Sequence, residues 1–158
     1  IGNFNPIEAV NFLKSARRVA RDDGAMLIGV DLEKDVNVLE AAYDDEAGVT
    51  AAFNLNLLRR MERDLNAELS VNDFEHMAFF NQDKKRIEMH LKAVRDTKII
   101  VENQSFEFAP LETIHTENSH KYTPDRFAAL AGQAGWQIGY IWTDPRDFFA
   151  LFWLNPAL

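Results

Sequence analysis

The chain has 158 residues, of which 47% are hydrophobic and 27% are charged, and this composition is typical of one globular domain and not of a disordered or fibrous protein. Its formal net charge of −8 argues against nucleic acid as a partner, and its lack of cysteine excludes disulfides and thiolate metal sites and fits a cytoplasmic protein. No apolar run approaches the ~18 residues that a membrane span requires, and the first residue is Ile1, so we expect no membrane partner and a portion of a longer protein.

The first predicted element is a helix over residues 5–24. Asn5 can cap its start, and Glu8 completes a capping box with Asn5. Gly24 can adopt the left-handed conformation in which helices often end. Apolar residues recur at helical spacing between these limits, which predicts one buried stripe.

A strand over residues 25–32 is predicted next. Its apolar run does not alternate, which is typical of a central parallel strand covered on both faces. A helix followed by such a strand implies a βαβ unit, with residues 1–3 as the end of the preceding strand. Because ligands of open α/β sheets bind beyond the carboxyl ends of the strands, we expect Gly2, Asn3 and Asp31 at a binding site.

Three further helical segments are predicted before the pattern changes. Residues 35–45 and residues 50–65 both carry apolar side chains at helical spacing. Residues 72–80 begin with a second capping-box signature, formed by Asn72 and Glu75.

From residue 85 the period changes to that of strands. Residues 86–95 alternate apolar and polar side chains, which predicts a strand with one wet face, and residues 97–110 continue it as a hairpin. The polar stretch 112–122 is expected to end this antiparallel section as irregular backbone. Residues 123–135 then predict a capped helix, and residues 136–154 predict two strands joined by a turn.

Together these elements predict an α/β fold, namely the C-terminal part of a Rossmann-like core with an inserted antiparallel α+β subdomain. We expect residues 1–45 to belong to the core, residues 46–122 to form the insertion, and residues 123–158 to return as a closing helix and β-hairpin. A core without its first half would expose an apolar edge, so self-association of the chain is a further expectation.

The polar stretch contains the donor types of two kinds of catalytic site. His115, Glu117 and His120 could bind zinc or iron, but their spacing matches no helix-face ligand pair, so we favour loop hydrogen bonding and predict no metal. Ser119 beside a histidine and an acid resembles hydrolase parts, yet the sequence has no G-x-S-x-G elbow. The glycines form neither G-x-G-x-x-G nor a P-loop, so the usual cofactor loop of an α/β core is absent from this sequence.

Three single residues have two interpretations on the residue pattern alone. Tyr43 fits a half-buried tyrosine with a hydrated hydroxyl as well as a binding residue. Met89 fits the core side of a strand as well as a pocket wall. Glu117 is either a solvated loop acid or a hydrogen-bond acceptor directed into a cleft.

The chain closely resembles the C-terminal part of the histidine-specific, S-adenosylmethionine-dependent (SAM-dependent) methyltransferases in five ordered segments: IGNFNP, LEAAYDDEAGVTAAFNLNLLRRMERDL, RIEMHL, IHTENSHKY and WTDPRDFFALFWL. Members of that family trimethylate the α-amino group of histidine in ergothioneine biosynthesis. The resemblance runs through essentially the whole chain and implies a class I methyltransferase fold. It also implies SAM as the cofactor, bound mainly by an N-terminal half upstream of Ile1, so the chain alone is expected to be inactive.

The resemblance further implies substrate-binding roles for five residues. Asn3 and Tyr43 would hold the carboxylate and amino end of histidine. Glu117 and Ser119 would hydrogen-bond its imidazole ring, and Met89 would form an apolar wall beside that ring. No side chain is expected to be catalytic, because methyl transfer from a sulfonium mainly requires a neutral amine aligned at ~3–3.5 Å.

Two alternative functions remain open at this point. One is N-methylation of another aromatic amino acid such as tryptophan, although the acid at Glu117 argues for imidazole because a larger apolar ring prefers an uncharged wall. The other is a non-catalytic α/β binding module, which a glycine-rich loop upstream of this chain would exclude.

Overall fold

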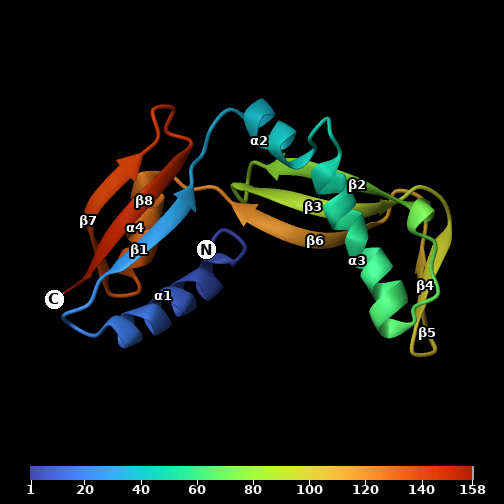
Figure 1. Ribbon diagram of the computed structural model, residues 1–158, viewed down its shortest axis with the longest axis horizontal. Coiled ribbons are helices and arrows are strands. Elements are labelled where there is room, and N and C mark those ends of the chain that lie inside the picture. Colours follow the sequence, from blue (N-terminus) through green and yellow to red (C-terminus); the bar gives the residue numbers. More distant parts are fainter. Residues whose placement is uncertain (158) are drawn as a thin grey trace. The chain divides into compact units, whose positions relative to one another are not determined.

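The chain passes twice from one structural unit into a second unit and back. The computed structural model describes residues 1–157 (Figure 1). Unit 1 consists of Ile1–Asp35, Asn81–Arg86 and the segment that starts at Asn118, and unit 2 consists of Val36–Phe80 and Ile87–Glu117. Unit 2 is therefore an insertion within the sequence of unit 1.

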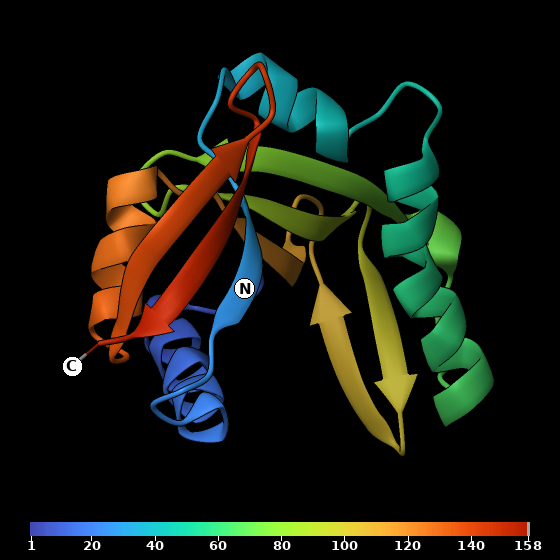
Figure 2. The same ribbon diagram turned by 60° about the vertical axis from the view of Figure 1, so that its left-hand side comes forward.

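Unit 1 is a three-stranded antiparallel sheet with helices on one face. Its elements are α1 (Pro6–Ala20), β1 (Met26–Asp31), α4 (Pro124–Gly132), β7 (Trp136–Thr143) and β8 (Phe149–Pro156). The strand order is β1-β8-β7, so β8 is the central strand (Figure 2). Apolar side chains of both helices and of the inner sheet face form one core, in which Leu13, Phe127 and Phe152 are fully buried.

Helix α1 begins as predicted and ends earlier. The Asn5 and Glu8 side chains form the expected capping box. The left-handed residue at the end of the helix is Arg21, with φ of 57°, and not Gly24. Gly24 is required for a different reason, because a Cβ at this position would lie 2.2 Å from the carbonyl oxygen of Ala20.

Strand β1 differs from the predicted central parallel strand. Within the described residues its strand neighbour is β8, which pairs with it antiparallel. The expected strand end at residues 1–3 is wrong, because the Phe4 N–H donates to the Ile1 carbonyl across 3.2 Å and closes a turn there. The prediction that both faces of β1 are covered also fails within this chain, since Leu27 is 55% exposed.

The face of this sheet that bears Leu27 is apolar and exposed across all three strands. Leu27 and Tyr140 both pair with Trp153, and Trp142 pairs with Leu151, so these side chains share one face. Each of the five is at least 37% exposed. The apolar run in the sequence thus reflects two apolar faces, of which the chain itself covers one.

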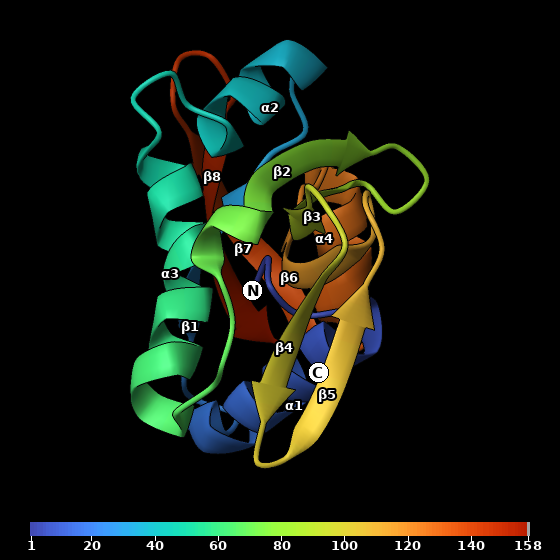
Figure 3. The same cartoon turned by 90° about the vertical axis from the view of Figure 1, so that its right-hand side faces the viewer.

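Unit 2 combines helices with two small antiparallel sheets. Its elements are α2 (Val36–Tyr43), α3 (Val49–Leu65), the single 3₁₀ turn η1 (Val71–Asp73), β2 (Phe74–Asn81), β3 (Arg86–Ala93), β4 (Thr97–Val101), β5 (Gln104–Phe108) and β6 (Thr113–His120). One sheet has the order β2-β3-β6, and β4 and β5 form a separate two-stranded ribbon (Figure 3). The chain leaves and re-enters this unit along β2, β3 and β6.

The predicted helix at residues 72–80 is wrong, because these residues form η1 and strand β2. Phe74 belongs to one apolar cluster of unit 2, whereas Ala78 and Phe80 pack on another. This spacing of two is that of a strand, and the long-range burial of these side chains overrides the local capping signal of Asn72 and Glu75.

The polar stretch expected to be irregular is instead the regular strand β6. The Ala93 N–H donates to the Glu112 carbonyl (2.8 Å) at one end, and the Lys121 N–H donates to the Lys85 carbonyl (2.9 Å) at the other. This pattern places β6 antiparallel to β3. The side chains of the stretch are consequently fixed in direction by the pleat of the sheet.

The remaining predicted elements are confirmed. Helices α2, α3 and α4, strand β3, and the β4–β5 and β7–β8 hairpins lie where the sequence pattern places them. The wet face predicted for β3 is not exposed, however, because Glu88 and His90 are 5% and 9% exposed. No helix among residues 1–157 is long and apolar enough to cross a membrane.

Candidate functional site

The five predicted site residues are distributed over both units. Asn3 and Ser119 belong to unit 1, whereas Tyr43, Met89 and Glu117 belong to unit 2. Asn3 lies in the first turn, Tyr43 is the last residue of α2, and Met89 lies in β3. Glu117 and Ser119 lie two residues apart on β6, so their side chains leave the strand on the same side.

In unit 1, the turn that carries Asn3 lies against the end of β6. The His120 N–H donates to the Gly2 carbonyl across 2.8 Å. A Cβ on Gly2 would lie 3.4 Å from the His120 carbonyl oxygen and 3.7 Å from Oγ of Ser119. The structure therefore brings the Gly2–Asn3 turn and Ser119 together, although they are far apart in the sequence.

The residues that follow β6 run beside the end of β1. Leu32 and Tyr122 form a parallel β-bridge, and the Tyr122 N–H donates to the Asp31 carbonyl across 3.0 Å. The short segment 119–122 therefore contacts Gly2 at one point and Asp31 at another. This agrees with the expectation that the first turn and the carboxyl end of β1 lie at one place.

Lys121 stands at the centre of this junction and is fully buried. Its Nζ donates to Oδ2 of Asp31 and to Oγ of Ser119, both at 2.7 Å. Lys34 donates to the other carboxylate oxygen of Asp31 at 2.6 Å. Burial by itself would raise the pKa of Asp31, but the hydrogen bonds and charges of Lys121 and Lys34 outweigh it and hold the pKa below its usual value.

In unit 2, Tyr43 and Met89 belong to one apolar cluster. Met89 is 3% exposed and lies with the buried side chains of Leu39 and Ile87, and Tyr43 packs against this group. Tyr43 and Met89 therefore belong to the same cluster, and Met89 has the burial of a core residue.

A buried hydrogen-bond chain connects this cluster with β6. Oδ1 of Asn54 accepts the hydroxyl of Thr116 at 2.8 Å, and its Nδ2 lies 3.0 Å from Nδ1 of His76. Nε2 of His76 lies 2.8 Å from the Tyr43 carbonyl, which can only accept, so Nε2 carries the ring proton and Nδ1 accepts from Asn54. The chain thus runs from the residue before Glu117 to the backbone of Tyr43.

The structure gathers a different set of metal-donor types from the one considered in the sequence. Donor atoms of Glu88, His90 and His115 lie within 4.8 Å of one another. The rings of His90 and His115 are stacked, with centroids 4.5 Å apart and planes 12° from parallel. Because the lone pair of a ring nitrogen lies in the ring plane, these two rings do not direct their lone pairs to one ion. Phe79 stacks on the other side of His90, so the group is an aromatic stack.

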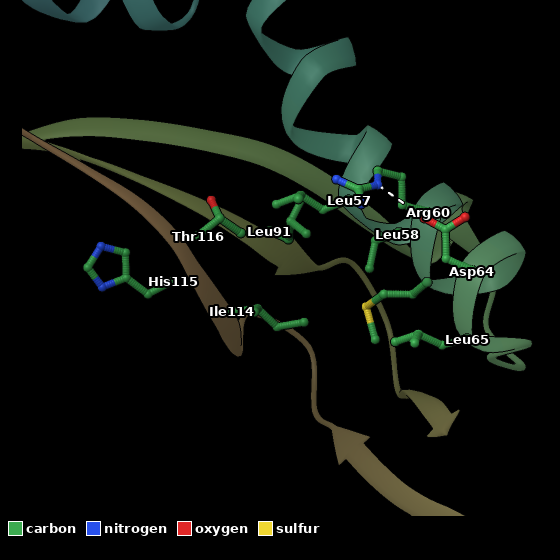
Figure 4. Close-up of a pocket in the computed structure, with 10 residues that line it drawn as sticks. Leu57, Leu58, Arg60, Asp64, Leu65, Leu91, Ile114, His115 and Thr116 are labelled. Atoms are coloured by element: carbon green, nitrogen blue, oxygen red, sulfur yellow. Dashed lines mark hydrogen bonds and ion pairs between the residues drawn. The ribbon is translucent and has the colours of Figure 1, made fainter. Parts of the chain in front are cut away.

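An apolar cavity of about 470 Å³ lies between α3 and strands β3 and β6 of unit 2 (Figure 4). It is lined mainly by aliphatic and sulfur-containing side chains, with polar groups at its border: Leu57, Leu58, Met61, Leu65, Leu91, Ile114, Arg60, Asp64, His115 and Thr116. Arg60 and Asp64 pair with each other at 3.3 Å. None of the five predicted site residues lines this cavity.

Three glycines of this chain lie close to neighbouring atoms. A Cβ on Gly24 would meet the Ala20 carbonyl, one on Gly29 would meet the Phe149 ring at 2.6 Å, and one on Gly139 would meet the Asn155 side chain at 2.6 Å. These three glycines allow close packing within the chain.

Sequence reasoning missed two residues that organise these surroundings, Asn54 and Lys121. Asn54 is fully buried and lies four residues before buried Leu58 on α3, so a polar residue in the apolar stripe was an available signal. Lys121 had no such signal, because a lysine in a polar stretch is normally solvated.

Known proteins resemble the chain along its whole length. The family model described as "Histidine-specific methyltransferase, SAM-dependent" matches residues 1–156. The histidine N-alpha-methyltransferase of Mycolicibacterium smegmatis is 39% identical over 153 residues, covering 96% of this chain and 48% of that protein. Ergothioneine biosynthesis protein 1 of Neurospora crassa is 30% identical over 151 residues, covering 94% of this chain and 17% of that protein.

A more distant relative and a solved structure complete the comparison. The L-tryptophan methyltransferase trpM of Psilocybe serbica is 26% identical over 162 residues, covering 98% of this chain and 44% of that protein. The structure of the CcbJ methyltransferase from Streptomyces caelestis matches with a TM-score of 0.50 and 9% identity, covering 99% of this chain and 53% of that one. The predicted fold class is thereby confirmed. The chain spans about half the length, or less, of the relatives it matches.

Proposed function

The chain belongs to the family of histidine-specific, SAM-dependent methyltransferases, and on that premise we propose that it is the C-terminal portion of a cytoplasmic enzyme that methylates the α-amino group of histidine. The observation that carries this proposal is the family match over residues 1–156, which includes every predicted substrate residue. Because the chain is about half as long as its relatives, the activity is assigned to the longer protein, and the chain alone is expected to be inactive.

Within this proposal, each end of the substrate has its own contacts. Asn3 binds the carboxylate and amino end of the substrate, with Tyr43 as the second contact for that end. Glu117 and Ser119 bind the imidazole ring, with Met89 as an apolar wall. The proposed recognition insertion is residues 46–122, and SAM is bound mainly by the part of the protein that precedes Ile1. The lack of a G-x-G-x-x-G or P-loop pattern in this sequence supports that division.

The chemistry required of this chain is orientation and selection. SAM, when bound, supplies a methyl group that is already electrophilic, so the amine must be neutral and aligned and no nucleophilic side chain is required. An acceptor for a ring N–H at Glu117 rejects an analogue without that N–H, because the acid would be left unpaired. The direction of β6 supports this role, since its pleat fixes where Glu117 and Ser119 project.

A second candidate substrate is tryptophan, which is favoured by the similarity to the L-tryptophan methyltransferase of Psilocybe serbica. An indole also carries one N–H, and Glu117 could accept it. The burial of a carboxylate against a large apolar ring is costly, however, and Ser119 would face no ring acceptor. We therefore favour histidine.

The test is the Glu117→Ala variant of the full-length protein. The loss of one charged hydrogen bond predicts a kcat/KM for histidine that falls by about 10–150-fold. The affinity for SAM, measured by calorimetry, should change by less than about twofold, because the cofactor is assigned to another part of the protein. Glu75→Ala is the matched control, since Glu75 is exposed and pairs with Lys92 on the same sheet. An equal loss of histidine use and SAM binding would contradict the imidazole role.

A further inference from the structure

Two hydrogen bonds attach helix α2 to strand β2 within unit 2. The backbone N–H of Phe80 donates to Oε1 of Glu40 across 2.9 Å. Nε2 of His76 donates to the main-chain carbonyl of Tyr43 across 2.8 Å. Tyr43 is the last residue of α2, where helix carbonyls lack the N–H groups of a following turn. His76 therefore caps the carboxyl end of α2 at a residue that is proposed above to contact the substrate.

The place of His76 on β2 requires such partners. His76 lies between Phe74 and Ala78 at a spacing of two, so the three side chains share one face of the strand. Phe74 belongs to one apolar cluster of unit 2, and Ala78 packs on another. An imidazole on this covered face costs free energy unless its ring nitrogens are hydrogen-bonded.

The protonation of the His76 ring is determined from both of its nitrogens. Nδ2 of Asn54 lies 3.0 Å from the His90 carbonyl, so this end of the Asn54 amide is a donor. The same Nδ2 lies 3.0 Å from Nδ1 of His76, which must therefore accept. An imidazole that accepts at Nδ1 is neutral and carries its proton at Nε2, the atom that faces the Tyr43 carbonyl. The buried network thus selects the tautomer that can cap α2.

Resting on the proposed function, we infer that His76 is a positioning residue for the substrate contact of Tyr43. Its Nε2 proton holds the Tyr43 carbonyl, and the backbone held in this way sets the point from which the phenol extends. The Tyr43 ring packs against the apolar cluster of Leu39 and Met89, which restricts it from the other side. His76 contacts no substrate in this scheme and acts through Tyr43.

The first experiment divides the two hydrogen bonds of His76 between two variants of the full-length protein. In His76→Gln a side-chain N–H takes the place of Nε2–H and still reaches the Tyr43 carbonyl. In His76→Asn a side-chain oxygen replaces Nδ1 as the acceptor for Asn54, but the shorter side chain does not reach Tyr43.

The expected result is a change in the KM for histidine that depends on the contact retained. This KM should stay within about twofold of the wild-type value in His76→Gln and rise by about 3–10-fold in His76→Asn, the equivalent of one neutral hydrogen bond. The kcat and the affinity for SAM should change by less than about twofold in both variants, because the substrate contact alone is altered.

Glu40→Ala is the matched control. It removes the other hydrogen bond between α2 and β2 and leaves the one at the Tyr43 carbonyl in place. Its KM for histidine should stay within about twofold of the wild-type value. A rise equal to that of His76→Asn would show that the docking of the whole helix decides, and this would overturn the role of His76. Circular dichroism and thermal melting verify that each variant is folded.

The second experiment asks whether His76 acts through the Tyr43 side chain. Tyr43→Phe keeps the ring in its apolar cluster and removes the hydroxyl. If His76 acts through that hydroxyl, the double variant of His76→Asn and Tyr43→Phe has the same KM for histidine as Tyr43→Phe alone. Losses that multiply in the double variant would overturn the inference.

The outcomes separate the two proposals. A wild-type protein that neither binds nor methylates histidine overturns the proposed function, and the role of His76 with it. A wild-type protein that uses histidine, with KM values that rise equally in His76→Gln and His76→Asn or in neither, overturns only the role of His76. A rise in His76→Gln alone assigns the effect to the contact with Asn54 and overturns that role as well. If His76→Asn does not fold, the KM of His76→Gln decides, and a raised value is the negative result. If neither variant folds, His76 is a structural residue and the inference is overturned.

Discussion

Asn54 donates its side-chain N–H to the main-chain carbonyl of His90 across 3.0 Å, and both residues are buried. The same amide also contacts Thr116 and His76, so one side chain connects α3 with strands β2, β3 and β6. We expect Asn54→Leu to lower the free energy of unfolding by about 2–4 kcal/mol, because it leaves several buried polar groups unpaired. Urea denaturation monitored by circular dichroism measures the loss.

The matched control is Asn56→Leu on the same helix. Asn56 is exposed, so its replacement should change the free energy of unfolding by no more than about 0.5 kcal/mol. Similar losses for the two variants would indicate that the buried network contributes nothing beyond the helix propensity of the new residue.

We expect replacement by alanine to change the stability of the protein in opposite directions at Gly24 and at Gly132. In Gly24→Ala the new Cβ would lie 2.2 Å from the Ala20 carbonyl oxygen, so the backbone must move, at a cost of about 1–3 kcal/mol. In Gly132→Ala the new Cβ meets nothing within 4 Å in the last turn of α4, and higher helix propensity should stabilise the protein by up to about 1 kcal/mol. The urea midpoints of both variants provide the comparison. A stabilised Gly24→Ala variant would contradict the close approach.

Asp45 predicts a loss of stability in acid. Its carboxylate accepts the backbone N–H groups of Thr50 (2.8 Å) and Val49 (3.0 Å) at the start of α3. These hydrogen bonds lower the pKa of Asp45 from 3.8 to about 2. A lowered pKa means that the contribution is present above pH 3.8 and is lost as the pH falls toward 2. As the pH falls through this range, the unfolding midpoint should therefore decrease more steeply for the wild type than for Asp45→Ala. Asp44→Ala is the control, because Asp44 is exposed.

The apolar outer face of the unit 1 sheet predicts concentration-dependent self-association of the 158-residue chain. Trp142, Leu151 and Trp153 lie on this face and are 37–50% exposed, and contiguous apolar surface of this kind tends to be covered by another surface. Trp142→Lys should move the size-exclusion peak to later elution at high concentration. Val19→Lys is the control, because Val19 is 83% exposed on α1 and lies away from the sheet. A peak position independent of concentration in the unmodified chain would reject the prediction.

Local signals in the sequence were sufficient for elements that local chemistry stabilises. The capping box at Asn5 and the cap at Thr123 both form, because their partners lie within three residues. The hairpin turn at Glu102 and Asn103 forms without glycine, with φ of 49° and 67°. In these cases the residues that decide the conformation are neighbours in the chain.

Local signals could not predict the elements whose stability depends on residues far away in the sequence. The strand at residues 113–120 carries few large apolar side chains, and its stability comes from the ladder with β3. Asn3 and Glu117 could be proposed as site residues from the sequence, because both lie in segments that resemble the family. The place of Lys121 was not predictable, because its burial depends on Asp31 and on a segment far away in the chain.

The discontinuity of unit 1 has a consequence for biosynthesis. Residues 36–80 and 87–117 both precede β8 in the order of synthesis, so the sequence of unit 2 is complete before the strand that pairs with β1 is made. The indole N–H of Trp136, which donates to the Leu13 carbonyl at 2.9 Å, likewise closes its contact only after both segments of unit 2 have been synthesised. The apolar core that α1 and β1 share with α4, β7 and β8 therefore closes only after unit 2 has been synthesised.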